Sequence, residues 1–115
     1  MNEILNAQIK TTQLGRGDHR IFTFGLTLAI QGGLGVTVGG YAMDRYDKPK
    51  DRRVGTAYGM DLIIRILEVV GVRTWEELKG KYIRVEVPFN GGPVTKIGNL
   101  MEDKWVDFLT FGGEE

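Results

Sequence analysis

Basic residues stand directly before the start of a predicted helix. Lys48, Lys50, Arg52 and Arg53 precede Thr56, whose hydroxyl is of the kind that caps a helix N-terminus. The unpaired N–H groups and the positive end of the helix dipole favour an anion there, and arginine side chains add positive charge. We therefore expect a phosphate site at Thr56 and Arg53. The competing interpretation is an ordinary helix cap beside a solvated basic loop.

Aromatic side chains offer a second kind of ligand contact. Trp75 and Phe89 have flat π faces on which a nucleobase could stack, and Asn90 beside Phe89 carries an amide that can read a base edge. Arg20, like the arginines of the basic stretch, supplies a guanidinium group for phosphate. In the competing interpretation the tryptophan belongs to the core. The predicted ligand contacts are Arg20, Arg53, Thr56, Trp75, Phe89 and Asn90.

No catalytic pattern accompanies these residues. The sequence has no cysteine and a single histidine, His19, so it offers neither a thiol nucleophile nor a zinc cluster. Asp18 and His19 are adjacent on a predicted turn, where neighbours rarely face one site, and no serine or cysteine nucleophile stands out as a partner. We expect a protein that is not an enzyme and that needs no metal or cofactor. A phosphodiesterase using His19 is the enzymatic alternative.

Length and charge narrow the class of protein further. A chain of 115 residues with 42% hydrophobic residues predicts one domain, residues 1–115. Fifteen basic residues balance fifteen acidic ones, so no overall field would attract duplex nucleic acid. We see no signal-peptide pattern and no apolar run of the roughly 18 residues that a membrane span needs. A cytoplasmic protein without a membrane partner is expected.

The first half of the chain predicts an antiparallel meander. Segments 4–12, 20–30 and 34–41 have strand-forming composition and are separated by glycine-containing turns. In the second segment every other residue is apolar, which places one face of a strand in a core: Phe22, Phe24, Leu26, Leu28 and Ile30. The charged segment 43–54 that follows is predicted to be an exposed excursion.

The second half predicts two helices and a second hairpin. A helix over residues 56–70 ends at Gly71, and a shorter helix begins at the capping box formed by Thr74 and Glu77. Strands are expected over 82–87 and 94–101, and the aromatic segment after them docks on the body. The predicted fold is α+β: a twisted antiparallel sheet of about five strands, with one long and one short helix packed on one side.

The long helix is more apolar than one sheet face requires. Its hydrophobic residues, Ile66 and Val69 among them, cover an arc of roughly 220°, whereas a surface helix usually buries a stripe of roughly 100°. We therefore expect a homo-oligomer that assembles through this helix. The alternative is that the C-terminal segment of the same chain folds over it.

Three segments resemble a known family of phage and prophage proteins. Residues 39–44 (GGYAMD), 53–60 (RVGTAYGM) and 75–81 (WEELKGK) are similar to Thoeris anti-defence proteins of the first-described type. This resemblance implies a non-enzymatic homo-oligomer, a dimer or trimer of dimers, in the cytoplasm of an infected bacterial host. Such a protein sequesters cyclic ADP-ribose isomers made by TIR-domain enzymes and, in some members, cyclic di- or trinucleotides at separate sites. For the family's adenine pocket, Trp75 or Phe89 with Asn90 are the candidates here.

Other classes of binding protein fit the same residues. An apolar helix face is also what a protein–protein interaction module of a phage would present. The aromatic and arginine side chains would equally serve a single-stranded nucleic-acid binder. A panel of cyclic nucleotides discriminates these possibilities, because an interaction module should bind none of them.

Overall fold

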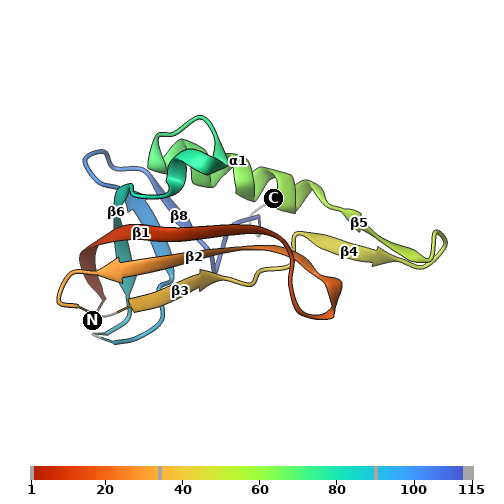
Figure 1. The fold of residues 1–115 in the computed structure, drawn as a ribbon, viewed down its shortest axis with the longest axis horizontal. Coiled ribbons are helices and arrows are strands. Elements are labelled where there is room, and N and C mark those ends of the chain that lie inside the picture. The colour runs from red at the N-terminus through yellow and green to blue at the C-terminus, as the bar shows by residue number, and fades with distance from the viewer. Residues whose placement is uncertain (1, 34, 90, 113–115) are drawn as a thin grey trace.

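A six-stranded antiparallel sheet forms the body of the fold (Figure 1). The computed structural model describes residues 2–33, 35–89 and 91–112. The strands lie in the order β3-β2-β1-β6-β7-β8, and a separate hairpin pairs β4 with β5. Their bounds are Glu3–Arg16 (β1), Phe22–Ile30 (β2), Gly35–Gly39 (β3), Asp44–Asp47 (β4), Arg52–Gly55 (β5), Tyr82–Val87 (β6), Lys96–Asn99 (β7) and Trp105–Asp107 (β8). The predicted α+β class is confirmed.

Strand β2 shows why the sequence forms this sheet. Phe24, Leu26 and Leu28 are buried, whereas Thr27 and Ala29 between and beyond them are exposed on the opposite face. Burying each such apolar side chain stabilises the fold by about 1.5–3 kcal/mol. The alternation predicted for residues 20–30 is therefore confirmed, and it fixes which face of the sheet the helices cover.

Helix α1 (Ala57–Val70) lies on that face (Figure 1). The Thr56 hydroxyl caps its N-terminus by accepting a hydrogen bond from the Gly59 N–H at 3.0 Å, and Gly71 ends it in the left-handed conformation at φ 90°. Both helix boundaries agree with the sequence prediction. The short 3₁₀ helices η1 (Asp18–Arg20) and η2 (Trp75–Leu78) complete the elements.

Burial along α1 corrects the predicted interface. Ile66 and Val69 are fully buried against the sheet within one chain, so they cannot mediate assembly without unfolding. The C-terminal segment covers another part of the helix, where Phe111 packs against Tyr58 with ring centroids 5.8 Å apart. Most of the apolar arc is thus covered within the monomer, and the large apolar side chains of α1 that remain exposed are Met60 and Ile64.

Two segments differ from their predicted structure. Residues 43–54, predicted to be an exposed excursion, are largely exposed but form the regular β4–β5 hairpin, which projects from the body beyond the start of α1 (Figure 1). The C-terminal aromatic segment contributes a sixth strand, β8, where about five strands were expected. Of the helices in the described ranges, none combines the length and apolar character needed to cross a membrane.

Candidate functional site: an arginine cavity beside the helix start

Asp44 on β4 forms a bidentate ion pair with Arg53 on β5, within the hairpin, and also accepts a hydrogen bond from β2 of the sheet. The Asp44 carboxylate accepts hydrogen bonds from Nε and Nη2 of Arg53, each at 2.9 Å, and from the backbone N–H of Phe22 at 3.1 Å. The Asp44 side chain is only 9% exposed and that of Arg53 is 28% exposed. Hydrogen bonding to Arg53 is the main reason that the pKa of Asp44 lies below its usual value. The ion pair therefore joins β4 to β5, whereas the hydrogen bond from Phe22 N–H to Asp44 and the backbone bond from Met43 N–H to the Phe22 carbonyl, at 2.8 Å, position the hairpin relative to β2.

Four arginines meet in a cavity between this hairpin and the β1–β2 turn. We call it the arginine cavity; its volume is about 500 Å³. Arg16 comes from the end of β1, Arg20 from the turn, and Arg52 and Arg53 from β5. Arg16 and Arg20 are close in sequence, as are Arg52 and Arg53, and the fold brings these two pairs together from the turn and from the hairpin. The remaining lining residues are His19, Tyr46 and Asp51.

The charge of the arginine cavity is strongly positive. Within the described residues, Arg16, Arg20 and Arg52 form no salt bridge and donate no side-chain hydrogen bond, whereas Arg53 is paired with Asp44. The carboxylate in the lining, Asp51, accepts a hydrogen bond from the Tyr46 hydroxyl. Guanidinium groups present planar sets of donors that match phosphate and carboxylate. The arrangement is therefore suited to binding an anion.

The backbone of the cavity rim adopts left-handed conformations. His19 and Arg20, at φ 58° and 63°, are the central residues of the β1–β2 turn, where Ile21 N–H donates to the Asp18 carbonyl at 3.2 Å. Two positive φ angles in succession are those of a type I′ turn, which usually takes Asn-Gly. Asp51 is also left-handed, at φ 52°. In the described ranges, these are the non-glycine residues with positive φ, and all line one cavity.

An apolar cavity adjoins the first one. We call it the helix-start cavity; its volume is about 280 Å³, and Arg16 and Arg53 line it as well as the arginine cavity. Its walls come from β2, the hairpin and the first two turns of α1. The apolar residues that line it are Phe22, Met43, Val54, Met60 and Ile63.

Three of the predicted contact residues lie around these two cavities. Arg20 and Arg53 line the arginine cavity, and Thr56 lines the helix-start cavity together with Arg53. The Thr56 hydroxyl already accepts from Gly59 N–H and donates to the Met43 carbonyl at 3.0 Å. Thr56 therefore acts as a helix cap, and its hydroxyl proton is not free for a ligand.

Trp75 lies against the core, away from both cavities. Its indole meets the ring of Phe24 edge-on, with centroids 5.9 Å apart and an interplanar angle of 74°. The side chain is half-buried, and the indole N–H is buried without a hydrogen-bond partner in the described part of the chain. Its packing is that of the competing interpretation, in which the tryptophan is a core residue.

Phe89 lies near the opposite end of the sheet. It follows β6, whose residue Val87 pairs with Glu3 at the start of β1, whereas Arg16 ends β1. At about 3.3 Å per residue, these positions are about 40 Å apart along the strand. The ring is 60% exposed. Phe89 and the arginine cavity can therefore contact one small ligand only if two copies of the chain contribute; Asn90 lies outside the described residues.

Of the seven residues that line the arginine cavity, only Arg20 and Arg53 were predicted as ligand contacts, and Arg16 and Tyr46 show why the others were missed. Arg16 stands between two glycines in a segment that was interpreted as a turn, and Tyr46 stands within the charged segment. The available signals were an arginine at the tip of a hairpin and a lone aromatic residue among charges. Neither signal indicates a shared site, because Arg16 and Tyr46 come together only through the way in which Asp44 anchors the hairpin.

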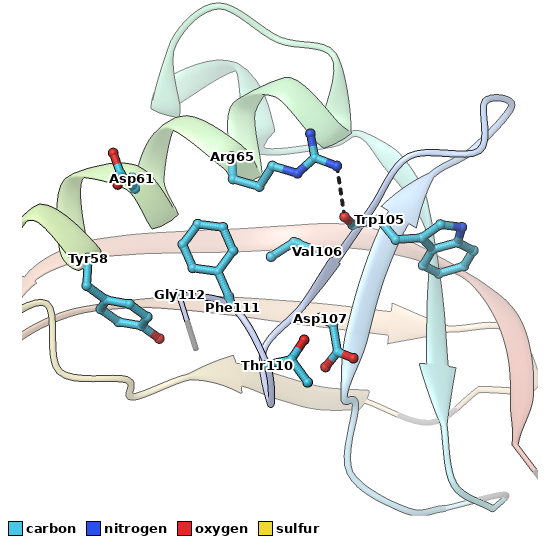
Figure 2. A pocket seen from close by; sticks show the side chains of 9 residues that line it. All are labelled: Tyr58, Asp61, Arg65, Trp105, Val106, Asp107, Thr110, Phe111 and Gly112. Carbon is cyan, nitrogen blue, oxygen red and sulfur yellow. Dashed lines mark hydrogen bonds between the residues drawn. The ribbon is translucent and has the colours of Figure 1, made fainter. Parts of the chain in front are cut away.

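A further cavity, of about 410 Å³, separates α1 from the C-terminal segment (Figure 2). Asp61 and Asp107 line it with Arg65, and its aromatic wall is formed by Tyr58 and Phe111. Arg65 Nη2 donates to the Trp105 carbonyl at 3.1 Å, the dashed contact in Figure 2, and Arg65 also pairs with Glu68 rather than with Asp61. This cavity is less suited to an anion than the arginine cavity, because it has the two carboxylates of Asp61 and Asp107 and one guanidinium, that of Arg65, which already forms a hydrogen bond.

Metal ligands do not gather anywhere in the described ranges: no group of three or more His, Cys, Asp or Glu side chains is arranged to hold an ion. No protein-family model matches the chain, and a search of curated proteins finds no match either. The resemblance to Thoeris anti-defence proteins therefore stays a prediction.

Proposed function

We propose that this protein binds and sequesters a small cyclic nucleotide signal without cleaving it. Cyclic ADP-ribose isomers are the first candidates, followed by cyclic di- and trinucleotides. The observation that carries the proposal is the convergence of Arg16, Arg20, Arg52 and Arg53 on one cavity of about 500 Å³. Its biological setting would be the cytoplasm of an infected bacterial host, where such a phage protein would act against defence.

The physical argument rests on phosphate chemistry. A phosphate oxygen accepts charge-assisted hydrogen bonds from guanidinium groups, each contributing about 1.5–3 kcal/mol. Arg16, Arg20 and Arg52 are exposed and without salt bridges in the described ranges, so a ligand need not displace an internal carboxylate to reach them. Because the cavity is open to solvent, binding should weaken as salt is added. The volume falls within the range of small-molecule sites, about 300–1,000 Å³.

Sequestration without turnover is proposed because positive charge dominates the lining. Arginine side chains stay protonated and cannot act as general bases. Tyr46 donates to Asp51, and this hydrogen bond raises the pKa of the phenol, which keeps it protonated at neutral pH. His19, the residue of the phosphodiesterase alternative, also lines the cavity, so the chemical state of the recovered ligand decides between sequestration and turnover.

A panel of ligands tests the proposal. Thermal shift is measured with cyclic ADP-ribose isomers, 3′,5′-cyclic AMP, cyclic di-AMP and cyclic triadenylate, and the bound compound is recovered after heat denaturation. We expect at least one compound to raise the melting temperature and to be recovered unchanged. A chemically altered product would instead indicate an enzyme. No stabilisation by any member would remove the proposal and favour a protein–protein interaction module.

Matched arginine variants locate the site once a ligand is found. Arg52→Ala should weaken it by about 1.5–3 kcal/mol, roughly 10- to 150-fold. Arg45→Ala is the control, because Arg45 is an exposed arginine of the same hairpin that does not line the arginine cavity. Equal affinities of these two variants would place the ligand elsewhere.

A homo-oligomer is proposed alongside ligand binding. Met60 and Ile64 on α1 remain 60% and 46% exposed, and apolar side chains exposed side by side on a helix are common at interfaces between copies. The same two residues would serve the alternative function, docking of another protein. Light scattering of the purified chain at micromolar concentration distinguishes a monomer from a closed assembly.

A further inference from the structure

The two cavities beside the hairpin share a boundary. Arg16 and Arg53 line both the arginine cavity and the helix-start cavity. The guanidinium of Arg53 is held there by Asp44 through Nε and Nη2, while Nη1 forms no hydrogen bond within the described residues. A fixed cation therefore stands between a polar compartment and an apolar one.

We propose that the helix-start cavity holds the heteroaromatic base of the nucleotide whose phosphate lies in the arginine cavity. This inference rests on the proposed function, because it concerns another part of the same ligand. It also places the base against the apolar lining of this cavity rather than at Trp75 or Phe89, the two aromatic residues that the sequence analysis offered for stacking. The ligand class it implies is a phosphate-bearing molecule with one flat ring joined to the phosphate by a short polar segment.

The walls of the helix-start cavity suit a flat ring. The Phe22 side chain is half-buried at its edge, and Val54 and Ile63 add half-buried aliphatic surface. An aromatic ring gains favourable contacts with another ring and with aliphatic groups, provided that it leaves water in doing so. A phosphate group makes no favourable contact with these apolar side chains. The base should therefore lie in the helix-start cavity and the phosphate in the arginine cavity.

Two methionines add adaptable contacts. Met43 is 3% exposed and forms the cavity floor, whereas Met60 is 60% exposed at its rim on α1. Thioether groups are polarisable and pack well against the faces and edges of aromatic rings. The exposed Met60 side chain would lose contact with water when a ring enters, so occupation of this cavity buries apolar surface that is otherwise solvated.

The backbone next to the helix-start cavity limits the kind of group that the cavity can hold. A Cβ atom on Gly59 would stand 2.3 Å from the Met43 carbonyl oxygen, so α1 and the segment before β4 are in direct contact at the cavity floor. This close approach leaves no room for a side chain at residue 59, and the cavity volume of about 280 Å³ suits a single ring rather than a long acyl chain or a peptide helix.

A matched pair of ligands isolates the base. Adenosine 5′-monophosphate and ribose 5-phosphate share the ribose and the phosphate, and a C1 hydroxyl in the second takes the place of the adenine in the first. Both are titrated into protein labelled with ¹³C at the methionine methyl groups. We expect the Met43 and Met60 signals to shift with adenosine 5′-monophosphate and to shift far less with ribose 5-phosphate. The Met101 signal is the internal control, because Met101 lies outside both cavities.

Variants of α1 supply the second control. Met60→Ala should weaken adenosine 5′-monophosphate by about 5-fold, through lost apolar contact, and leave ribose 5-phosphate unchanged. Ile64→Ala changes an exposed apolar residue one turn later that does not line the cavity, and it should affect neither ligand.

The outcomes separate this inference from the proposed function. Equal affinities for the two ligands, or equal effects of Met60→Ala and Ile64→Ala, overturn the base assignment. If Arg52→Ala still weakens both ligands in that case, phosphate binding at the arginine cavity stands. If neither ligand shifts the Met43 or Met60 signal at millimolar concentration, the base assignment fails, and the thermal-shift panel with Arg52→Ala decides the proposed function separately.

Discussion

Replacing Asp44 by asparagine should loosen the β4–β5 hairpin and destabilise the protein. The Asp44 carboxylate accepts three short hydrogen bonds, two from Arg53 and one from the Phe22 N–H. The amide of asparagine has one acceptor oxygen and carries no charge, so it cannot maintain the bidentate geometry and leaves part of the guanidinium unpaired. The ion pair links the two strands of the hairpin, and the bond from the Phe22 N–H links the hairpin to the sheet, so the substitution weakens both connections.

The magnitude follows from how deeply the pair is buried. Exposed ion pairs contribute about 0–1 kcal/mol, and breaking a fully buried pair costs about 3–5 kcal/mol. With the carboxylate 9% exposed and the guanidinium 28% exposed, this pair lies between those limits. We expect Asp44→Asn to lower the free energy of unfolding by about 2 kcal/mol.

Urea denaturation measures this effect, and Asp47→Asn is the matched control. Asp47 is a half-buried carboxylate on the same strand that accepts only a 3.3 Å contact from the Lys50 N–H. A double-mutant cycle with Arg53→Gln then isolates the coupling between the two partners. If Asp44→Asn and Asp47→Asn destabilise the protein equally, or if the coupling is near zero, the hairpin is not anchored as argued here.

Three other outcomes follow from the same contacts. The pKa of Asp44 is lowered in the folded state, so its carboxylate stabilises the protein above its unfolded pKa of about 3.9. This contribution is lost as pH falls through the folded pKa. The difference in unfolding free energy between wild type and Asp44→Asn should therefore narrow on acidification below about pH 4. Ile66→Glu should unfold the chain, as measured by circular dichroism, because the Ile66 side chain is fully buried. Ile64→Glu should keep the fold, because Ile64 is exposed, and should dissociate an assembly if α1 mediates one. Gly59→Ala should destabilise by about 1–3 kcal/mol in urea, because its Cβ would stand 2.3 Å from the Met43 carbonyl oxygen; an unchanged midpoint would show that α1 can shift away from that segment.

Regular patterns in the sequence were sufficient to predict the central elements. The alternation of β2 and the cap residues Thr56 and Gly71 are local signals, and the structure confirms the elements that they predict. Strand β8 has only three residues, too few to show alternation, and its pairing with β7 is a tertiary effect. The hairpin is charged on both strands, so its order comes from backbone pairing and from Asp44, which hydropathy does not reveal.

The candidate site was only partly predictable for a related reason. Arg53 and Thr56 are neighbours in sequence, and their proximity needed no knowledge of the fold. Arg16 reaches the same cavity because β1 runs its full length before the turn, which composition alone does not specify. That length also carries Phe89 to the far end of the sheet, so residue types suited to one ligand do not converge within one chain.

Calorimetric titration of cyclic ADP-ribose into the Arg20→Ala/Arg52→Ala double variant tests the central claim most directly. Both side chains line the arginine cavity and are exposed, so their loss should leave the fold intact. The control is Arg45→Ala/Arg73→Ala, which removes the same charge from exposed arginines outside the cavity. We predict that the wild type and the control bind alike and that the cavity variant binds at least about 100-fold more weakly. If the wild type does not bind cyclic ADP-ribose, the panel compound that stabilises it most takes its place in the same titration. Equal binding of the ligand by all three proteins would contradict the account.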